Sequence, residues 1–116
     1  MLHTQMDVWK AAMDFAAEVY RITQELPSDE RFGLTSQMRR AAVSIASNIA
    51  EGSGRESTRD IRHFIIQARG SLNEVTTQAA LCERLGYLKR SDVRTIEQYG
   101  LRLRQLIAGT IRHLRS

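Results

Sequence analysis

Apolar side chains recur along most of this chain at alternating steps of three and four residues, which places them on one face of an α-helix. Four segments show this pattern, and the first is a strict heptad, the spacing typical of helices that pack against other helices. Its apolar positions are Val8, Ala12, Phe15, Val19, Ile22 and Leu26. The sequence predicts helices over about residues 7–25, 35–52, 57–85 and 91–115.

Short polar links separate these segments, and capping residues mark their ends. Thr35, Ser57 and Ser91 are the expected N-caps, because a hydroxyl accepts a hydrogen bond from a free backbone N–H of the first turn. Gly86 is expected to close the third helix after Leu85, with Tyr87 folding back in a Schellman turn. Four amphipathic helices joined by short links predict an all-α fold: an antiparallel up-down-up-down four-helix bundle with a left-handed twist, with residues 1–116 forming a single domain.

The apolar stripe of the first predicted helix is wider than one packing seam requires. It is extended along one flank by Trp9, Met13, Ala16 and Tyr20. The spacing therefore indicates spare apolar surface, which another subunit would bury.

A long stretch of mixed residue types follows the first link. It runs from Phe32 to Gly52 and reads FGLTSQMRRAAVSIASNIAEG; further matches downstream are Phe64, Gly70-Ser71, Glu74 and Leu85-Gly86-Tyr87. In these residues the chain resembles the small four helix bundle protein family, also called S23 or 23S rRNA intervening-sequence proteins. That family is in turn similar to the accessory variability determinant of diversity-generating retroelements. The resemblance implies a four-helix bundle assembled as a homopentamer, with no established enzymatic activity. The family label describes where such genes are found and does not make the protein a ribosomal component.

Two polar stripes follow the helical spacing of the second and third predicted helices. We expect them to face each other or a neighbouring subunit, with Arg40 pairing with Glu74 or Glu51. A structural network that sets the register of the helices is one interpretation; a solvated face and a ligand site are the alternatives. The candidate network residues are Gln37, Arg40, Ser44, Asn48, Glu51, Gln67, Ser71, Glu74 and Gln78.

Positive charge is concentrated after the first helix. The net charge is +4, but residues 1–30 hold two basic and six acidic side chains, whereas residues 31–116 hold fifteen basic and seven acidic ones. Such a surface fits RNA or DNA, bound through phosphates with a steep salt dependence. It fits equally an acidic protein partner of a non-catalytic adaptor, or a solvated face with local ion pairs. The candidate nucleic-acid-binding residues are Arg55, Arg59, Arg62, Arg69, Lys89, Arg90 and Arg94.

The sequence offers no catalytic, metal-binding or cofactor-binding motif. Asp60 and His63 form D-x-x-H, whereas a di-iron bundle needs two E-x-x-H motifs and two further glutamates. Gly52-Ser53-Gly54 lacks the phosphate-loop pattern, and the lone Cys82 falls on a core position. We therefore expect no enzyme activity and no cofactor. Cys82 cannot form a disulfide within the chain, and neither a signal peptide nor a membrane span is visible, so we expect a cytoplasmic protein.

Overall fold

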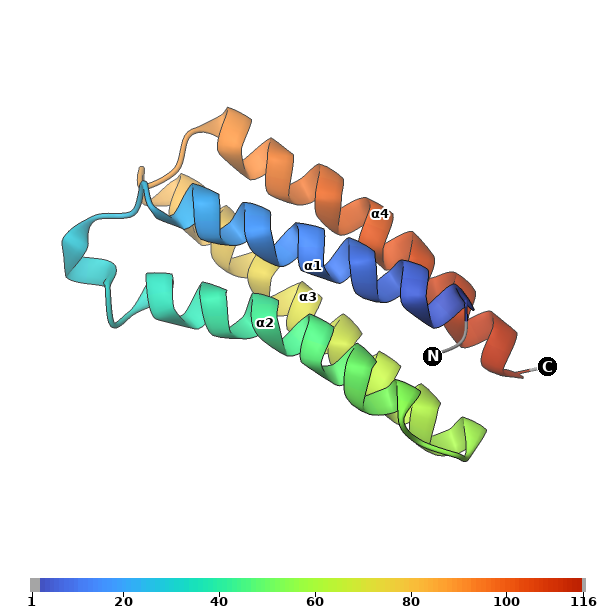
Figure 1. Cartoon of the computed structure of the whole chain (residues 1–116). Helices are drawn as coiled ribbons and strands as arrows, with labels where there is room; N and C mark the ends of the chain where they lie inside the picture. Colours follow the sequence, from blue (N-terminus) through green and yellow to red (C-terminus); the bar gives the residue numbers. More distant parts are fainter. Residues whose placement is uncertain (1–2, 116) are drawn as a thin grey trace.

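A computed structural model describes residues 3–115 of the chain, with side chains from Gln5 to Leu114. These residues form four long helices and contain no strand, which confirms the predicted all-α class (Figure 1). Residues 1, 2 and 116 of the predicted domain lie outside the described range. The helices are α1 (His3–Thr23), α2 (Leu34–Ser53), α3 (Thr58–Arg84) and α4 (Arg90–Arg115), with a short 3-10 turn, η1 (Ser28–Glu30), between α1 and α2.

The four helices form a ring in which each packs against two neighbours: α1 with α2, α2 with α3, α3 with α4, and α4 with α1. Figure 1 shows successive helices crossing the length of the molecule in alternate directions. The α2–α3 link lies at the same end as the chain termini, and the other two links lie at the opposite end. The α1/α2 and α3/α4 faces are consequently on opposite sides of the bundle. The left-handed twist stays a prediction.

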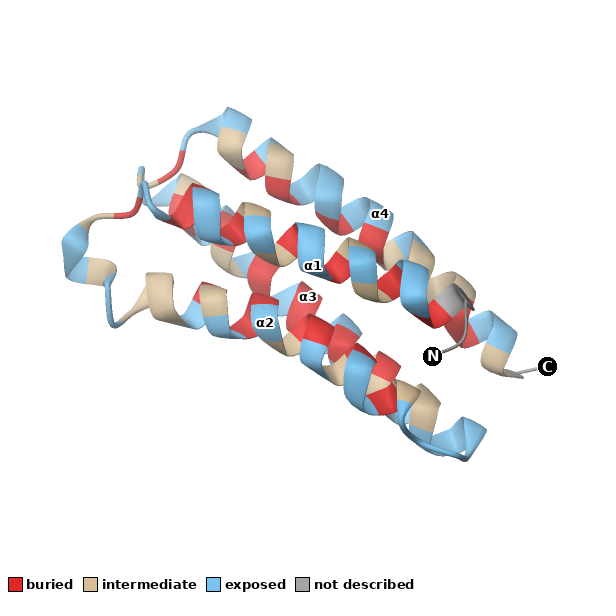
Figure 2. Cartoon of the chain, in the orientation of Figure 1, coloured by how far each residue is buried: buried red, intermediate tan, exposed pale blue. Residues whose placement is uncertain are grey.

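The core consists of the apolar stripes that the spacing predicted. All six heptad positions of the first segment are buried, and buried positions follow the inner sides of the helices in Figure 2. The largest fully enclosed side chains include Phe15, Ile45, Leu72 and Ile107, one from each helix. Burial of these apolar groups is the main stabilising term for a bundle of this size.

Two helix starts differ from the prediction. Thr35 is not the N-cap of α2: the cap is Gly33, and the amide of Leu34 donates to the Glu30 side chain at 3.1 Å. The turn η1 brings that carboxylate to the helix start, so no hydroxyl is needed there. Helix α4 begins at Arg90, which places Ser91 inside its first turn rather than at the cap. The amides of Asp92 and Val93 both donate to the carbonyl of Lys89, at 3.1 and 3.2 Å.

Helix α1 begins at His3 and ends at Thr23, earlier at both ends than predicted. The Thr23 hydroxyl donates to the carbonyl of Val19 at 2.7 Å and contacts that of Tyr20 at 3.2 Å. The Thr23 hydroxyl thus bonds to backbone carbonyls of the last helical turn. The helix ends at this residue. Leu26, the last heptad position, is therefore buried from the link and not from the helix.

The two ends of α3 follow the prediction. The Ser57 hydroxyl accepts from the amide of Asp60 at 3.0 Å. At the other end Gly86 has a φ of 78°, a conformation that glycine adopts readily. The amide of Tyr87 then donates to the carbonyl of Cys82 at 2.8 Å, which closes a Schellman turn. Both ends depend on residues close in sequence, so sequence alone identifies them.

Candidate functional site

The structure separates the seven predicted nucleic-acid-binding residues into two groups. One group runs from just before α3 to near the middle of that helix, and the other surrounds the start of α4 (Figure 1). Arg69 is the residue of the first group nearest to α4 in sequence, and residues 70–84 of α3 lie beyond it, a length of about 22 Å at 1.5 Å per residue. The seven residues therefore do not form one surface. The first group is Arg55, Arg59, Arg62 and Arg69; the second is Lys89, Arg90 and Arg94.

Acidic neighbours offset the charge of the second group. The guanidinium of Arg90 pairs with Glu83 at 2.9 Å and with Glu97 at 2.7 Å. Exposed pairs of this kind contribute only about 0–1 kcal/mol to stability. Their main consequence is that this end of the bundle offers less net positive charge to a phosphate.

The Arg55 side chain also forms local contacts. Its guanidinium pairs with Glu51 at 2.5 Å and lies 4.9 Å from the centroid of the Phe64 ring. These contacts hold it on the α2 side of α3. Arg59 is exposed near the start of α3, beside the exposed carboxylate of Asp60.

Arg62 and Arg69 lie on the opposite side of α3, toward α4. They precede Asn73 by eleven and four residues, which places all three on one stripe of the helix. The Asn73 side chain accepts from Arg104 of α4 at 2.7 Å, so this stripe borders α4. The bond also shows the register of the two helices, in which Arg104 is level with Asn73.

This register brings together two segments without acidic residues, 61–73 of α3 and 101–115 of α4. We call Arg62, Arg69, Arg104 and Arg112 the basic face. None of the four forms an ion pair within the described part of the chain. Arg104 and Arg112 were not among the predicted residues, although the lack of any acid after residue 100 was a signal for them. Arg102 is different, because it lines a hollow with Asp7 and Asp14 of α1.

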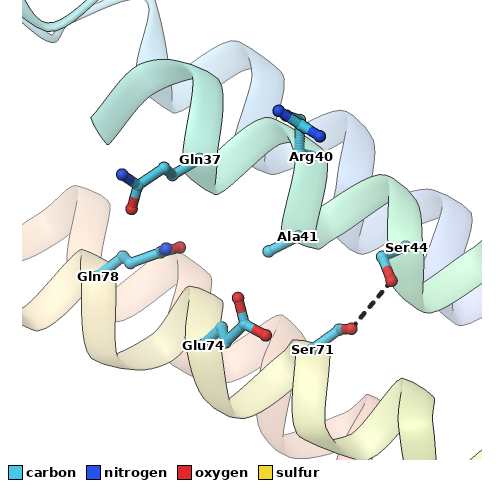
Figure 3. Close-up of a pocket in the computed structure, with 7 residues that line it drawn as sticks. All are labelled: Gln37, Arg40, Ala41, Ser44, Ser71, Glu74 and Gln78. Atoms are coloured by element: carbon cyan, nitrogen blue, oxygen red, sulfur yellow. Dashed lines mark hydrogen bonds between the residues drawn. The ribbon is translucent and has the colours of Figure 1, made fainter. Parts of the chain in front are cut away.

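The predicted polar stripes meet in an open groove of about 410 Å³ between α2 and α3 (Figure 3). The Ser44 and Ser71 hydroxyls are 3.0 Å apart and join the two helices. The side-chain amide of Asn48 donates to the Ser44 hydroxyl at 3.0 Å and to its carbonyl at 2.8 Å. Gln67 is exposed and does not line the groove. The groove is lined by Gln37, Arg40, Ala41, Ser44, Ser71, Glu74 and Gln78.

The expected pairing of Arg40 with Glu74 or Glu51 is wrong for this structure. In Figure 3 the Arg40 guanidinium points away from Glu74. Glu51 pairs with Arg55 instead, one helical turn further along. Neither Arg40 nor Glu74 has an ion-pair partner among the residues that the structure describes. The bond across α2 and α3 is therefore between neutral hydroxyls, and the role of the wider network stays a prediction.

We expect the Ser44–Ser71 bond to stabilise the bundle and to couple the two positions. Ser71 is 9% exposed, so Ser44→Ala leaves its hydroxyl nearly buried without this partner, at a cost of about 1 kcal/mol. Urea unfolding of both single variants and the double variant measures the coupling. The double variant should lose about 0.5–1 kcal/mol less than the sum of the single losses. Strict additivity would show that the bond contributes nothing.

A second groove, of about 300 Å³, lies between α1 and α2 and has a mainly apolar lining. Met13 and Val43 are 46% and 44% exposed there. Nearby, Arg39 donates to the Thr23 hydroxyl at 2.9 Å and lies 4.7 Å from the Tyr20 ring centroid. The spare apolar surface predicted for α1 thus continues onto α2. Its lining residues are Trp9, Met13, Ala16, Val43, Ala46, Ser47 and Ala50.

The side chains considered for chemistry lie in ordinary surroundings. Cys82 is fully buried, with its Sγ 3.7 Å from the Met38 sulfur, and burial raises the pKa of its thiol. A thiol with a raised pKa is a poor nucleophile. The described residues include no group of three or more His, Cys, Asp or Glu side chains placed to hold a metal. None of the described helices is both long enough and apolar enough to cross a membrane.

Comparison with known proteins agrees with this architecture. The fold is similar to the crystal structure of a protein with unknown function from the S23 ribosomal protein family of Bacteroides thetaiotaomicron VPI-5482. The TM-score is 0.85 at 22% sequence identity, and the match covers 94% of this chain and 98% of that one. No curated protein matches the chain. The sequence model of the 23S rRNA-intervening sequence proteins matches residues 4–109. The chain therefore belongs to the 23S rRNA-intervening sequence protein family.

Proposed function

We propose that this protein is a non-catalytic, cytoplasmic four-helix bundle that self-associates and binds the phosphate backbone of RNA or DNA. The observation that carries the proposal is the basic face, where two acid-free segments lie side by side at one end of α3 and α4. Arginine pairs with phosphate through two parallel N–H donors, which favours it over lysine at such a surface. Fifteen of the seventeen cationic side chains are arginine.

Binding of this kind reads charge and not sequence. Direct readout requires side chains that reach base edges in a groove or stack on exposed bases. The four arginines of the basic face come from two helices that lie side by side, and the described part of the acid-free segments exposes no Phe, Tyr or Trp ring. The exposed rings there are the imidazoles of His63 and His113. The proposal is therefore for sequence-independent contact with phosphates, driven largely by the release of counterions.

Self-association is proposed through the α1/α2 groove. Met13, Tyr20 and Val43 are all more than 40% exposed on that face, and contiguous apolar surface is characteristic of protein–protein contacts. The α1/α2 and α3/α4 faces lie on opposite sides of the ring. An assembly built through the first face leaves the basic face open to nucleic acid. A homopentamer is the size that the family resemblance implies.

A filter-binding titration with generic RNA and DNA tests the nucleic-acid proposal. We expect retention at 50 mM salt that falls steeply as the salt concentration rises, because each phosphate contact releases condensed counterions. Absence of retention of both RNA and DNA at low salt would overturn the proposal. The protein would then be better described as an adaptor for an acidic protein partner, since an acid-free surface accommodates carboxylates as well.

Val43→Glu is expected to break the assembly. The substitution places a charge in the apolar α1/α2 groove, where burial by another subunit would leave the charge unpaired. Light scattering coupled to size exclusion should show an oligomer for the parent protein and a monomer for the variant at micromolar concentration. Leu101→Glu is the matched control, because Leu101 is 57% exposed on α4. If only the control variant dissociates, the assembly surface lies elsewhere; a monomeric parent protein would refute self-association itself.

A further inference from the structure

We propose that the basic face prefers double-stranded nucleic acid to single strands. This inference rests on the proposed function and specifies its ligand. It concerns Arg62 and Arg69 of α3 together with Arg104 and Arg112 of α4. Three properties of that surface support it: the position of the aromatic side chains, the density of charge that it meets, and the rigidity of the elements that carry it.

The Phe, Tyr and Trp side chains lie away from the basic face. Phe64 is the one such residue of segment 61–73, and it is on the α2 side of α3, where a Cβ on Gly52 would lie 3.0 Å from its Cβ. Its ring is also beneath the Arg55 guanidinium, 4.9 Å away. Segment 101–115 of α4 contains no Phe, Tyr or Trp. Proteins that bind single strands rely on such rings to stack unpaired bases. The two segments expose only the smaller imidazoles of His63 and His113 within the described residues, so the surface offers few of the contacts that single strands use best.

The charge density of the ligand favours a duplex. Double-stranded DNA carries one charge per about 1.7 Å, and it releases about 0.9 counterion per phosphate neutralised, compared with about 0.7 for single strands. If each of the four arginines meets one phosphate, the difference corresponds to roughly a sixfold tighter interaction with a duplex at 0.1 M salt. The preference from this source should narrow as salt approaches about 1 M.

The basic face is also held in place by its scaffold. Arg62 and Arg69 are two turns apart, about 10.5 Å along α3. Arg104 is tethered by its 2.7 Å hydrogen bond to Asn73. A duplex presents phosphates that are already ordered, whereas a flexible single strand must lose conformational freedom to match a fixed row of cations. This loss again favours the duplex.

Fluorescence anisotropy at 0.1 M salt tests the preference with ligands of equal phosphate content. The probes are a 20-base-pair DNA duplex, a 20-base-pair RNA duplex, and a 40-nucleotide strand designed without self-pairing. We expect at least one duplex to bind about five- to tenfold tighter than the single strand. Comparison of the two duplexes shows whether the preferred ligand is DNA or RNA. Arg69→Glu should weaken duplex binding more than Arg94→Glu, which makes the same charge change at the other end of the bundle.

The possible outcomes distinguish failure of the inference from failure of the proposed function. Equal or tighter binding of the single strand would overturn the duplex preference and leave backbone binding intact. Equal losses for Arg69→Glu and Arg94→Glu would overturn the assignment to the basic face. Failure of all three probes to bind, repeated at 50 mM salt, would refute the proposed function and the inference together.

Discussion

Reversal of two charges on the basic face, by Arg69→Glu combined with Arg104→Glu, should weaken binding to a 20-base-pair duplex by at least about 60-fold at 0.1 M salt. Each phosphate contact contributes about 0.9 to the slope of log affinity against log salt. Loss of two contacts removes nearly two orders of magnitude at this salt concentration, and repulsion by the new carboxylates adds to the loss. The slope itself should fall from about −3.6 to about −1.8. Anisotropy titrations at several salt concentrations measure both quantities.

Arg90→Glu combined with Arg94→Glu is the charge-matched control. It changes net charge by the same amount at the opposite end of the bundle, where Arg90 is already paired with Glu83 and Glu97. We expect a loss several-fold smaller than that of the first variant and a nearly unchanged salt slope. Thermal melts of both variants check that each remains folded. Similar losses from the two double variants would mean that net charge, and not the basic face, determines binding.

Gly52→Val should cost about 2–3 kcal/mol of stability, because overpacking of a closely fitted contact typically costs this much. Gly52 is buried where α2 ends against the start of α3. A Cβ there would lie 3.0 Å from the Cβ of Phe64 and 3.3 Å from the carbonyl oxygen of Ile61. Neither atom is the end of a flexible side chain, so the helices themselves must separate. We expect the melting temperature to fall by roughly 10 °C, measured by circular dichroism at fixed protein concentration.

Gly70→Val makes the same chemical change in open space. No atom lies within 4 Å of a Cβ built on Gly70, and valine is slightly better than glycine in a helix interior. Its stability should therefore change by less than about 0.5 kcal/mol. If Gly52→Val is as well tolerated as Gly70→Val, the close contact between α2 and α3 does not require glycine. Gly52→Ala should give an intermediate loss, because it adds the Cβ without the two methyl groups.

The number and type of the helices could be read from the sequence because apolar spacing is a local property of each segment. The caps at Ser57 and Gly86 were predictable for the same reason, since each bonds within a few residues. Prediction failed at Thr35, where Glu30 from the preceding turn supplies the acceptor for the helix start. It failed again at Arg40: Glu51 lies eleven residues further along α2, about 16 Å at 1.5 Å per residue, and the Arg40 guanidinium points away from Glu74 (Figure 3). In the first case the preceding turn supplied the acceptor, and in the second the direction of a side chain decided; spacing along a helix specifies neither.

The sequence by itself determined that this protein is a helical bundle, which side chains form its core, and that its positive charge follows the first helix. It also carried the family resemblance, which the match over residues 4–109 confirms. Only the tertiary structure decided which charges act together. Lys89, Arg90 and Arg94 lie apart from the arginines in the first half of α3. Arg104 of α4 lies beside that half of α3, because it bonds to Asn73. Helical periodicity specifies the direction in which a side chain projects from the axis of its helix. Which residues of different helices become neighbours depends on how those helices pair and on their register.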